Sequence, residues 1–139
     1  HAGHTAKTAD TKTQIGAFAA LRSQRRHVGR EALAWTIARE AVFARTRLRR
    51  VLQSLGGVER LKGVFRTGPE TWLLVQLAGD DLTVAESAWR RDSRVEALYS
   101  EGARVDAAAL ELALAAALSR QPRWRRRAHC FFLGAACSI

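Results

Sequence analysis

Two short apolar segments joined by a turn constrain the fold of this chain more than any other feature of its sequence. Residues 58–67 and 72–78 read as strands, and the Gly68-Pro69-Glu70-Thr71 stretch between them has turn chemistry. A further strand is indicated at residues 93–99, where apolar and polar side chains alternate. A hairpin cannot bury its own apolar face, so these strands require a second layer of structure that covers them.

Two amphipathic segments supply candidates for that layer. Residues 31–55 carry apolar side chains at steps of three and four, beginning at Leu33, and Gly56-Gly57 then favours the end of a helix. A second helix is predicted after Asp106, a good N-cap residue, and is expected to end near Ser119. Both segments are therefore predicted to be helices with one apolar side.

The segment at residues 14–22 completes the predicted order of elements. It alternates loosely and reads as a first strand, whereas residues 82–91 are ambiguous. The apolar side of this first strand would consist of Ile15, Ala17, Ala19 and Leu21. We therefore predict an α+β fold in the order β-α-β-β-β-α. It would be a two-layer sandwich in which one mostly antiparallel sheet of about four strands carries both helices on one face.

The chain of 139 residues suits a single domain, which we expect at residues 14–119. Residues 1–13 lack apolar periodicity and read as a linker remnant. Residues 120–139 form a basic and then apolar tail, which is either docked as a final strand, disordered, or buried against another chain. Because the chain opens with His1 and contains no Met, we expect it to be a piece of a longer protein.

The chain is strongly basic, with 23 Lys and Arg against 13 Asp and Glu and a net charge of +10. Thirteen of the basic residues lie in three runs, at residues 22–30, 45–50 and 120–127. A solvated basic surface is the simpler interpretation of these runs, and a small basic nucleic-acid-binding α+β module is the alternative.

No apolar stretch approaches the roughly 20 residues of a membrane span and no signal peptide is present, so we expect a cytoplasmic protein without a membrane partner.

No catalytic motif is recognisable in the chain. Neither of the glycine-rich phosphate-binding patterns, G-x-x-x-x-G-K-[ST] and G-x-G-x-x-G, is present, and the acidic residues between Asp80 and Glu111 are scattered along strands and turns. We therefore expect no enzymatic activity and no bound cofactor in this chain. His1 and His4 would hold a metal ion only weakly, because they supply two of the four ligands that a structural zinc site normally has.

Three segments in the same order resemble the C-terminal domain of the CobW-type GTPases, a family that includes metal chaperones of cobalt and zinc handling. They are residues 59–67 (ERLKGVFRT), residues 72–76 (WLLVQ), and residues 89–96 (WRRDSRVE) followed by 106–110 (DAAAL). The resemblance implies an N-terminal P-loop GTPase domain in the full-length protein, often joined through a His-rich linker. GTP, Mg and a transition metal such as zinc or cobalt would be the cofactors of that protein.

The same resemblance implies an interaction or regulatory role for this chain. Its partners would be the GTPase domain of the same protein, a client metalloprotein or a second copy. We take Arg60, Lys62 and Arg94 as candidate interaction residues, because the first two alternate with apolar neighbours and would reach a sheet surface. The simpler interpretation is an ordinary half-exposed strand. Trp72 and Trp89 read as core or edge aromatic residues rather than as ligand platforms.

Overall fold

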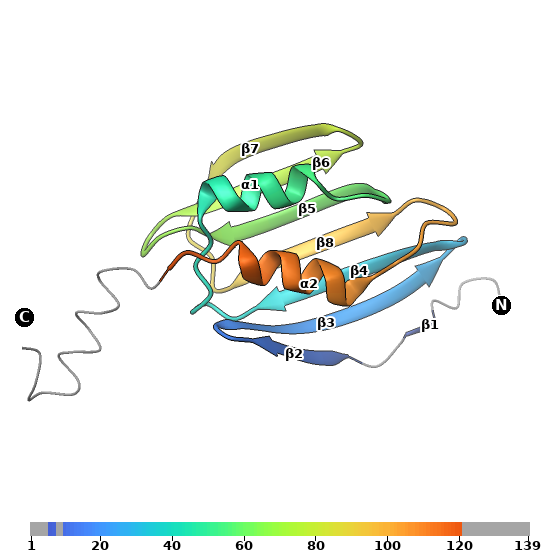
Figure 1. Cartoon of the computed structure of the whole chain (residues 1–139), viewed down its shortest axis with the longest axis horizontal. Helices are drawn as coiled ribbons and strands as arrows, with labels where there is room; N and C mark the ends of the chain where they lie inside the picture. The colour runs from blue at the N-terminus through green and yellow to red at the C-terminus, as the bar shows by residue number, and fades with distance from the viewer. Residues whose placement is uncertain (1–5, 8–9, 121–139) are drawn as a thin grey trace, which may run out of the picture.

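One antiparallel sheet dominates the computed structural model, which describes residues 6–7 and 10–120 (Figure 1). The elements are β1 (Ala6–Lys7), β2 (Thr11–Ile15), β3 (Phe18–His27), β4 (Arg30–Ile37), α1 (Arg45–Gln53), β5 (Val58–Arg66), β6 (Trp72–Ala78), β7 (Asp81–Ser87), β8 (Ser93–Tyr99) and α2 (Ala107–Ala116). The strand order is β1-β3-β4-β8-β5-β6-β7, and β2 also pairs with β3. The predicted α+β class with one antiparallel sheet and two helices is confirmed, but the element order differs from the predicted one.

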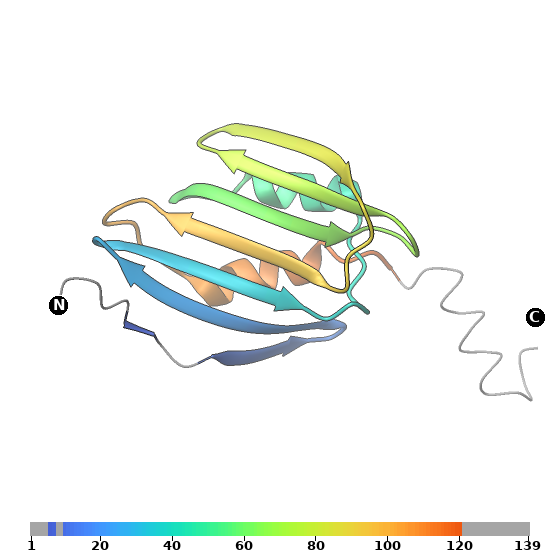
Figure 2. The same cartoon turned by 180° about the vertical axis from the view of Figure 1, so that it is seen from behind.

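The central strand is β8, which comes late in the chain and lies between β4 and β5. Both neighbours run antiparallel to β8, so they are parallel to each other. Helix α1 connects them over one face of the sheet, and α2 follows β8 onto the same face (Figures 1 and 2). The opposite face carries no helix in the part of the chain that the structure describes, as the view from behind shows (Figure 2).

The sheet is larger than the predicted four strands. It has eight strands in seven positions, because β1 and β2 both pair with the same neighbour, β3. The expected single strand at residues 14–22 was wrong: a turn at Gly16, whose φ of 59° suits glycine, separates β2 from β3. This turn resets the alternation, so that Phe18 and Ala20 are buried and Ala17 is exposed. Strand β2 begins at Thr11, inside the segment expected to be a linker.

The predicted helix over residues 31–55 was also wrong in its first half, which forms strand β4. Leu33 and Ile37 fit both a helical step of four and a strand step of two. Trp35, midway between them, shows that the segment is a strand. The side chains of Leu33, Trp35 and Ile37 are each at most 1% exposed and all lie on the helix-covered side of the sheet, as a step of two requires. Aromatic and β-branched residues also favour strands. Only residues 45–53 are helical, and α1 begins after Ala44 without a side-chain cap.

Three predicted strands agree closely with the structure, namely β5, β6 and β8, and the ambiguous segment at residues 82–91 contains all of β7 except its first residue, Asp81. The hydrophobic core lies between the sheet and the helices. The helices contribute Leu48, Leu52, Leu110 and Leu114 to it. Neither α1 nor α2 has the length and hydropathy of a membrane-spanning helix.

The start of α2 is fixed by the predicted cap. Oδ1 of Asp106 accepts a hydrogen bond of 3.0 Å from the backbone N–H of Ala109. We expect Asp106→Ala to lower the free energy of unfolding by about 1 kcal/mol, because one helix N–H loses its partner. Asp106→Asn keeps an acceptor at the same place and should cost much less. Urea denaturation of both variants measures the difference, and equal losses would contradict a capping role.

Candidate functional site

The sheet face opposite the helices brings side chains from five strands together. Because side chains alternate along a strand, this face receives the residues that lie between the core positions. The pairing register places them in rows across the sheet. One row contains Ser23, Ala34, Glu96, Lys62 and Gln76, and the next contains Arg25, Ala32, Leu98, Arg60 and Ala78.

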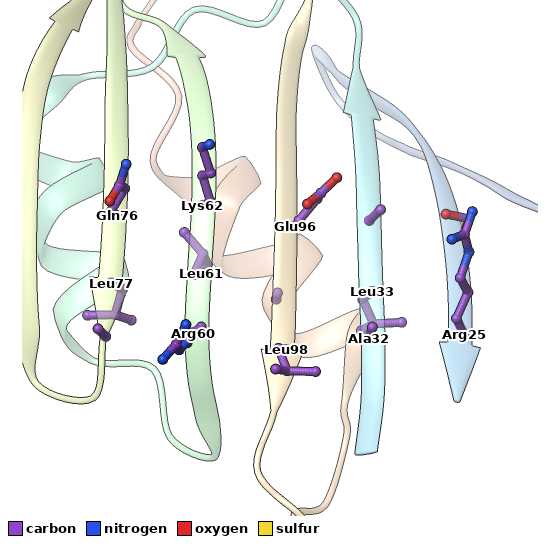
Figure 3. Close-up of a pocket in the computed structure, with 14 residues that line it drawn as sticks. Arg25, Ala32, Leu33, Arg60, Leu61, Lys62, Gln76, Leu77, Glu96 and Leu98 are labelled. Carbon is purple, nitrogen blue, oxygen red and sulfur yellow. The ribbon is translucent and has the colours of Figure 1, made fainter. Parts of the chain in front are cut away.

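These two rows line a groove of about 710 Å³, which we call the open-face groove (Figure 3). Its floor over β4 and β8 is aliphatic at Ala32, Ala34 and Leu98 and carries one acidic side chain, Glu96. Basic side chains stand on both sides of that floor, Arg25 on β3 and Arg60 and Lys62 on β5 (Figure 3). The groove therefore combines an apolar strip with positive charge along its sides.

The charged groups of the open-face groove are not neutralised by one another. Among the described residues, Arg25, Arg60, Lys62 and Glu96 form no ion pair and no side-chain hydrogen bond. Lys62 is the register partner of Glu96, yet the carboxylate of Glu96 is directed away from it, toward β4 (Figure 3). These charges are available to a partner.

The structure brings two of the three predicted interaction residues into this groove. Arg60 and Lys62 line it, whereas Arg94 lies on the same face in the next row and is not part of the lining. The Arg94 side chain is 70% exposed, and its Nε donates to Oδ1 of Asp92 at 2.9 Å. Arg94 therefore belongs to the surface around the groove.

The first basic run does not form one continuous surface. Arg22 lies on the helix-covered side and pairs with Glu111 at 3.0 Å, whereas Arg25 faces the open-face groove. Arg30 pairs with Glu59 at 2.7 Å. Since neighbouring members point to opposite sides or are already paired, the run gives little support to a nucleic-acid interface. The basic run at residues 120–127 falls almost entirely outside the described residues.

One buried carboxylate ties the first strands to α2. Glu111 accepts hydrogen bonds of 3.0 Å from Thr13 on β2, from Arg22 on β3 and from the Trp35 indole on β4. Its side chain is only 4% exposed, and all three of these donors belong to strands of the sheet. We assign this group a structural role.

The two tryptophans in question differ in burial. Trp72 is 1% exposed, and its Nε1 is the buried side-chain polar atom without a hydrogen-bond partner in the described part of the chain. Trp89 is 59% exposed, and the Arg39 guanidinium lies 5.8 Å from its ring centroid. Trp72 is thus buried as predicted, while Trp89 is a surface residue at the end of the sheet.

The structure does not place the predicted metal ligands. His1 and His4 lie outside the described residues, as do the two cysteines. Across residues 6–7 and 10–120, no group of three His, Cys, Asp or Glu side chains is close enough to hold a metal ion. The prediction of a weak site at His1 and His4 stays a prediction.

Several groove residues were missed from the sequence, notably Arg25, Ala34 and Glu96. The first belonged to a basic run that was interpreted as a solvated surface or as part of a nucleic-acid-binding module, and the second to the predicted helix. The alternation from Ala32 to Ile37, with Trp35 among the apolar positions, was the signal that would have revealed β4. Glu96 was interpreted as a solvated charge within its strand.

One antiparallel sheet with two helices on one face and charged side chains on the other defines a domain of the α+β class. The family model described as "Cobalamin synthesis protein cobW C-terminal domain" matches residues 33–118, which is more than half of the chain. The chain belongs to this family of CobW C-terminal domains, and the resemblance seen in its sequence is confirmed. No curated protein and no solved structure gives a match.

Proposed function

We propose that this chain is the non-catalytic interaction and regulatory domain of a CobW-type GTPase that takes part in zinc or cobalt homeostasis or in metal delivery. The family supports the general assignment as an accessory domain. Nucleotide and metal chemistry would belong to the GTPase part of that protein, because this chain has neither a phosphate-binding glycine motif nor a cluster of metal ligands among its described residues.

The observation that carries this proposal is the open-face groove. A sheet face usually packs against another layer, and here the helices cover only the other face. Arg60 and Lys62, which form no ion pair among the described residues, give this face positive charge that a partner of opposite charge would recognise. We propose the GTPase domain of the same protein as the first partner of this face, and a client metalloprotein as the second.

Hydrogen exchange tests the proposal directly. We expect a CobW-type GTPase domain, added to the 139-residue chain, to slow amide exchange in β4, β5 and β8, while the outer strand β7 exchanges as before. Calorimetry of the chain with Mg·GTP should show no binding. Unchanged exchange in the three central strands, or tight nucleotide binding by the chain alone, would contradict the proposed function.

A further inference from the structure

The part of the open-face groove that lies between Arg25 and Arg60 is about as wide as one α-helix. Arg25 and Arg60 lie in the same row of the sheet, with Ala32 and Leu98 between them. Three strand spacings of about 4.8 Å separate their backbones by roughly 14 Å. An α-helix with its side chains is about 10–12 Å across. A helix lying along β4 and β8 would therefore fit between the two arginines.

The floor of this strip suits an apolar helix face. Ala32 and Ala34 on β4 are small, which permits close approach, and Leu98 on β8 adds apolar surface. Helices already cover the other face of the same sheet in this way (Figures 1 and 2). A partner helix would thus repeat on the open face the packing that the core uses.

The basic side chains along the groove determine which residues a partner helix would carry on its two flanks. Arg25 stands on one side, and Arg60 and Lys62 stand on the other, all without ion pairs in the described chain. Acidic residues on both flanks of a helix would meet these groups. Glu96 interrupts the apolar floor and would favour one basic residue in the apolar stripe of the partner.

Two other occupants fit these charges less well. Nucleic acid would bring phosphates toward Glu96, and the groove lining contains no aromatic side chain on which bases could stack. The segment at residues 121–139 of this chain contains four arginines and no acidic residue, so it lacks the complementary charge.

We propose that the open-face groove binds an amphipathic α-helix of a partner protein, which lies along β4 and β8 and carries acidic residues on both flanks of its apolar stripe. The inference rests on the proposed function, since it names the chemistry of the partner that the accessory domain recognises.

Two synthetic helical peptides with the same apolar stripe test this inference, one with Glu on both flanks and one with Lys. Fluorescence anisotropy with the 139-residue chain should show the Glu peptide binding at least about tenfold more tightly than the Lys peptide. Arg60→Glu with Lys62→Glu should remove that preference. Arg49→Glu with Arg104→Glu makes the same change in net charge away from the groove and should leave it intact.

Equal binding of the two peptides, or equal effects of the two double variants, would overturn the inference. Displacement of the Glu peptide by single-stranded DNA at physiological salt would assign the groove to nucleic acid instead. If the chain self-associates and Arg60→Glu with Lys62→Glu abolishes this self-association, the groove binds a second copy of the chain instead. If no peptide binds but a GTPase domain still slows exchange in the central strands, the helix is wrong and the proposed function stands. If no peptide binds and the GTPase domain does not slow exchange, both the helix inference and the proposed function are wrong.

Discussion

Replacing Glu111 with alanine is expected to lower the free energy of unfolding by about 2–4 kcal/mol, because the substitution leaves the buried Trp35 indole and the partly exposed Arg22 guanidinium without their acceptor. Arg22 would lose its carboxylate partner, and the Trp35 indole and the Thr13 hydroxyl would lose their acceptor. Small domains are stable by about 5–15 kcal/mol in total, so the variant should unfold at much lower urea concentration. Tryptophan fluorescence during urea unfolding measures the effect.

Two comparisons separate the buried network from a general loss of charge. Glu40→Ala removes an exposed glutamate that forms no ion pair in the described part of the chain, and it should change stability by less than about 0.5 kcal/mol. Arg22→Met with Glu111→Leu removes both charges and should recover part of the stability lost in Glu111→Ala. A loss below about 1 kcal/mol for Glu111→Ala would mean that water replaces the network at little cost.

Alanine at Gly63 is expected to destabilise the chain by about 1–3 kcal/mol through overpacking. A Cβ atom there would lie 2.7 Å from Cε2 of Phe65 and 3.2 Å from the carbonyl oxygen of Arg94. The Phe65 ring is fully buried and meets Phe43 edge to face at 5.2 Å, so it has little room to move. Urea unfolding again gives the measurement.

Two further variants serve as controls for Gly63→Ala: the same substitution at an open position, and Gly63→Ala in a chain whose Phe65 ring is removed. At Gly56 a Cβ atom would meet nothing within 4 Å, so Gly56→Ala should be neutral or slightly stabilising. In a Phe65→Leu background the ring edge is gone, and Gly63→Ala should then cost much less than in the original chain. An undiminished cost in that background would show that the ring is not what excludes the methyl group.

The strands that could be predicted are those in which the sequence pattern has one interpretation. In β8 apolar and polar side chains alternate, whereas β5 and β6 are short apolar segments with turn-forming residues at their ends. Asp106 likewise marks the start of α2 through the chemistry of its own side chain. Local signals sufficed at these places because burial and propensity agree.

The first half of the chain was harder because its patterns are compatible with two periods. Apolar residues at 33, 37 and 41 continue those of α1 at helical spacing, although β4 ends at Ile37 and α1 begins only at Arg45. The helix also lacks a capping side chain that would mark its start. Tertiary pairing with β8 decides the outcome, and that pairing joins residues about sixty positions apart.

The candidate site was predictable only where a strand had been recognised. Arg60 and Lys62 were found because β5 was assigned correctly, so their outward direction followed from alternation. The opposite side of the groove required β3 and β4 and their register with β8. Charge alone did not indicate it, because Arg22 and Arg25 belong to the same basic run but lie three residues apart on β3 and therefore face opposite sides of the sheet.

The position of β8 has a consequence for biosynthesis. While the ribosome is still translating the codons before Ser93, the β2–β4 and β5–β7 ribbons have no strand to join them. The inner edges of β4 and β5 then offer unpaired amides and carbonyls to any nascent chain nearby. Insertion of residues 93–99 closes both edges in one step. Aggregation during synthesis should therefore depend on how quickly this one strand emerges.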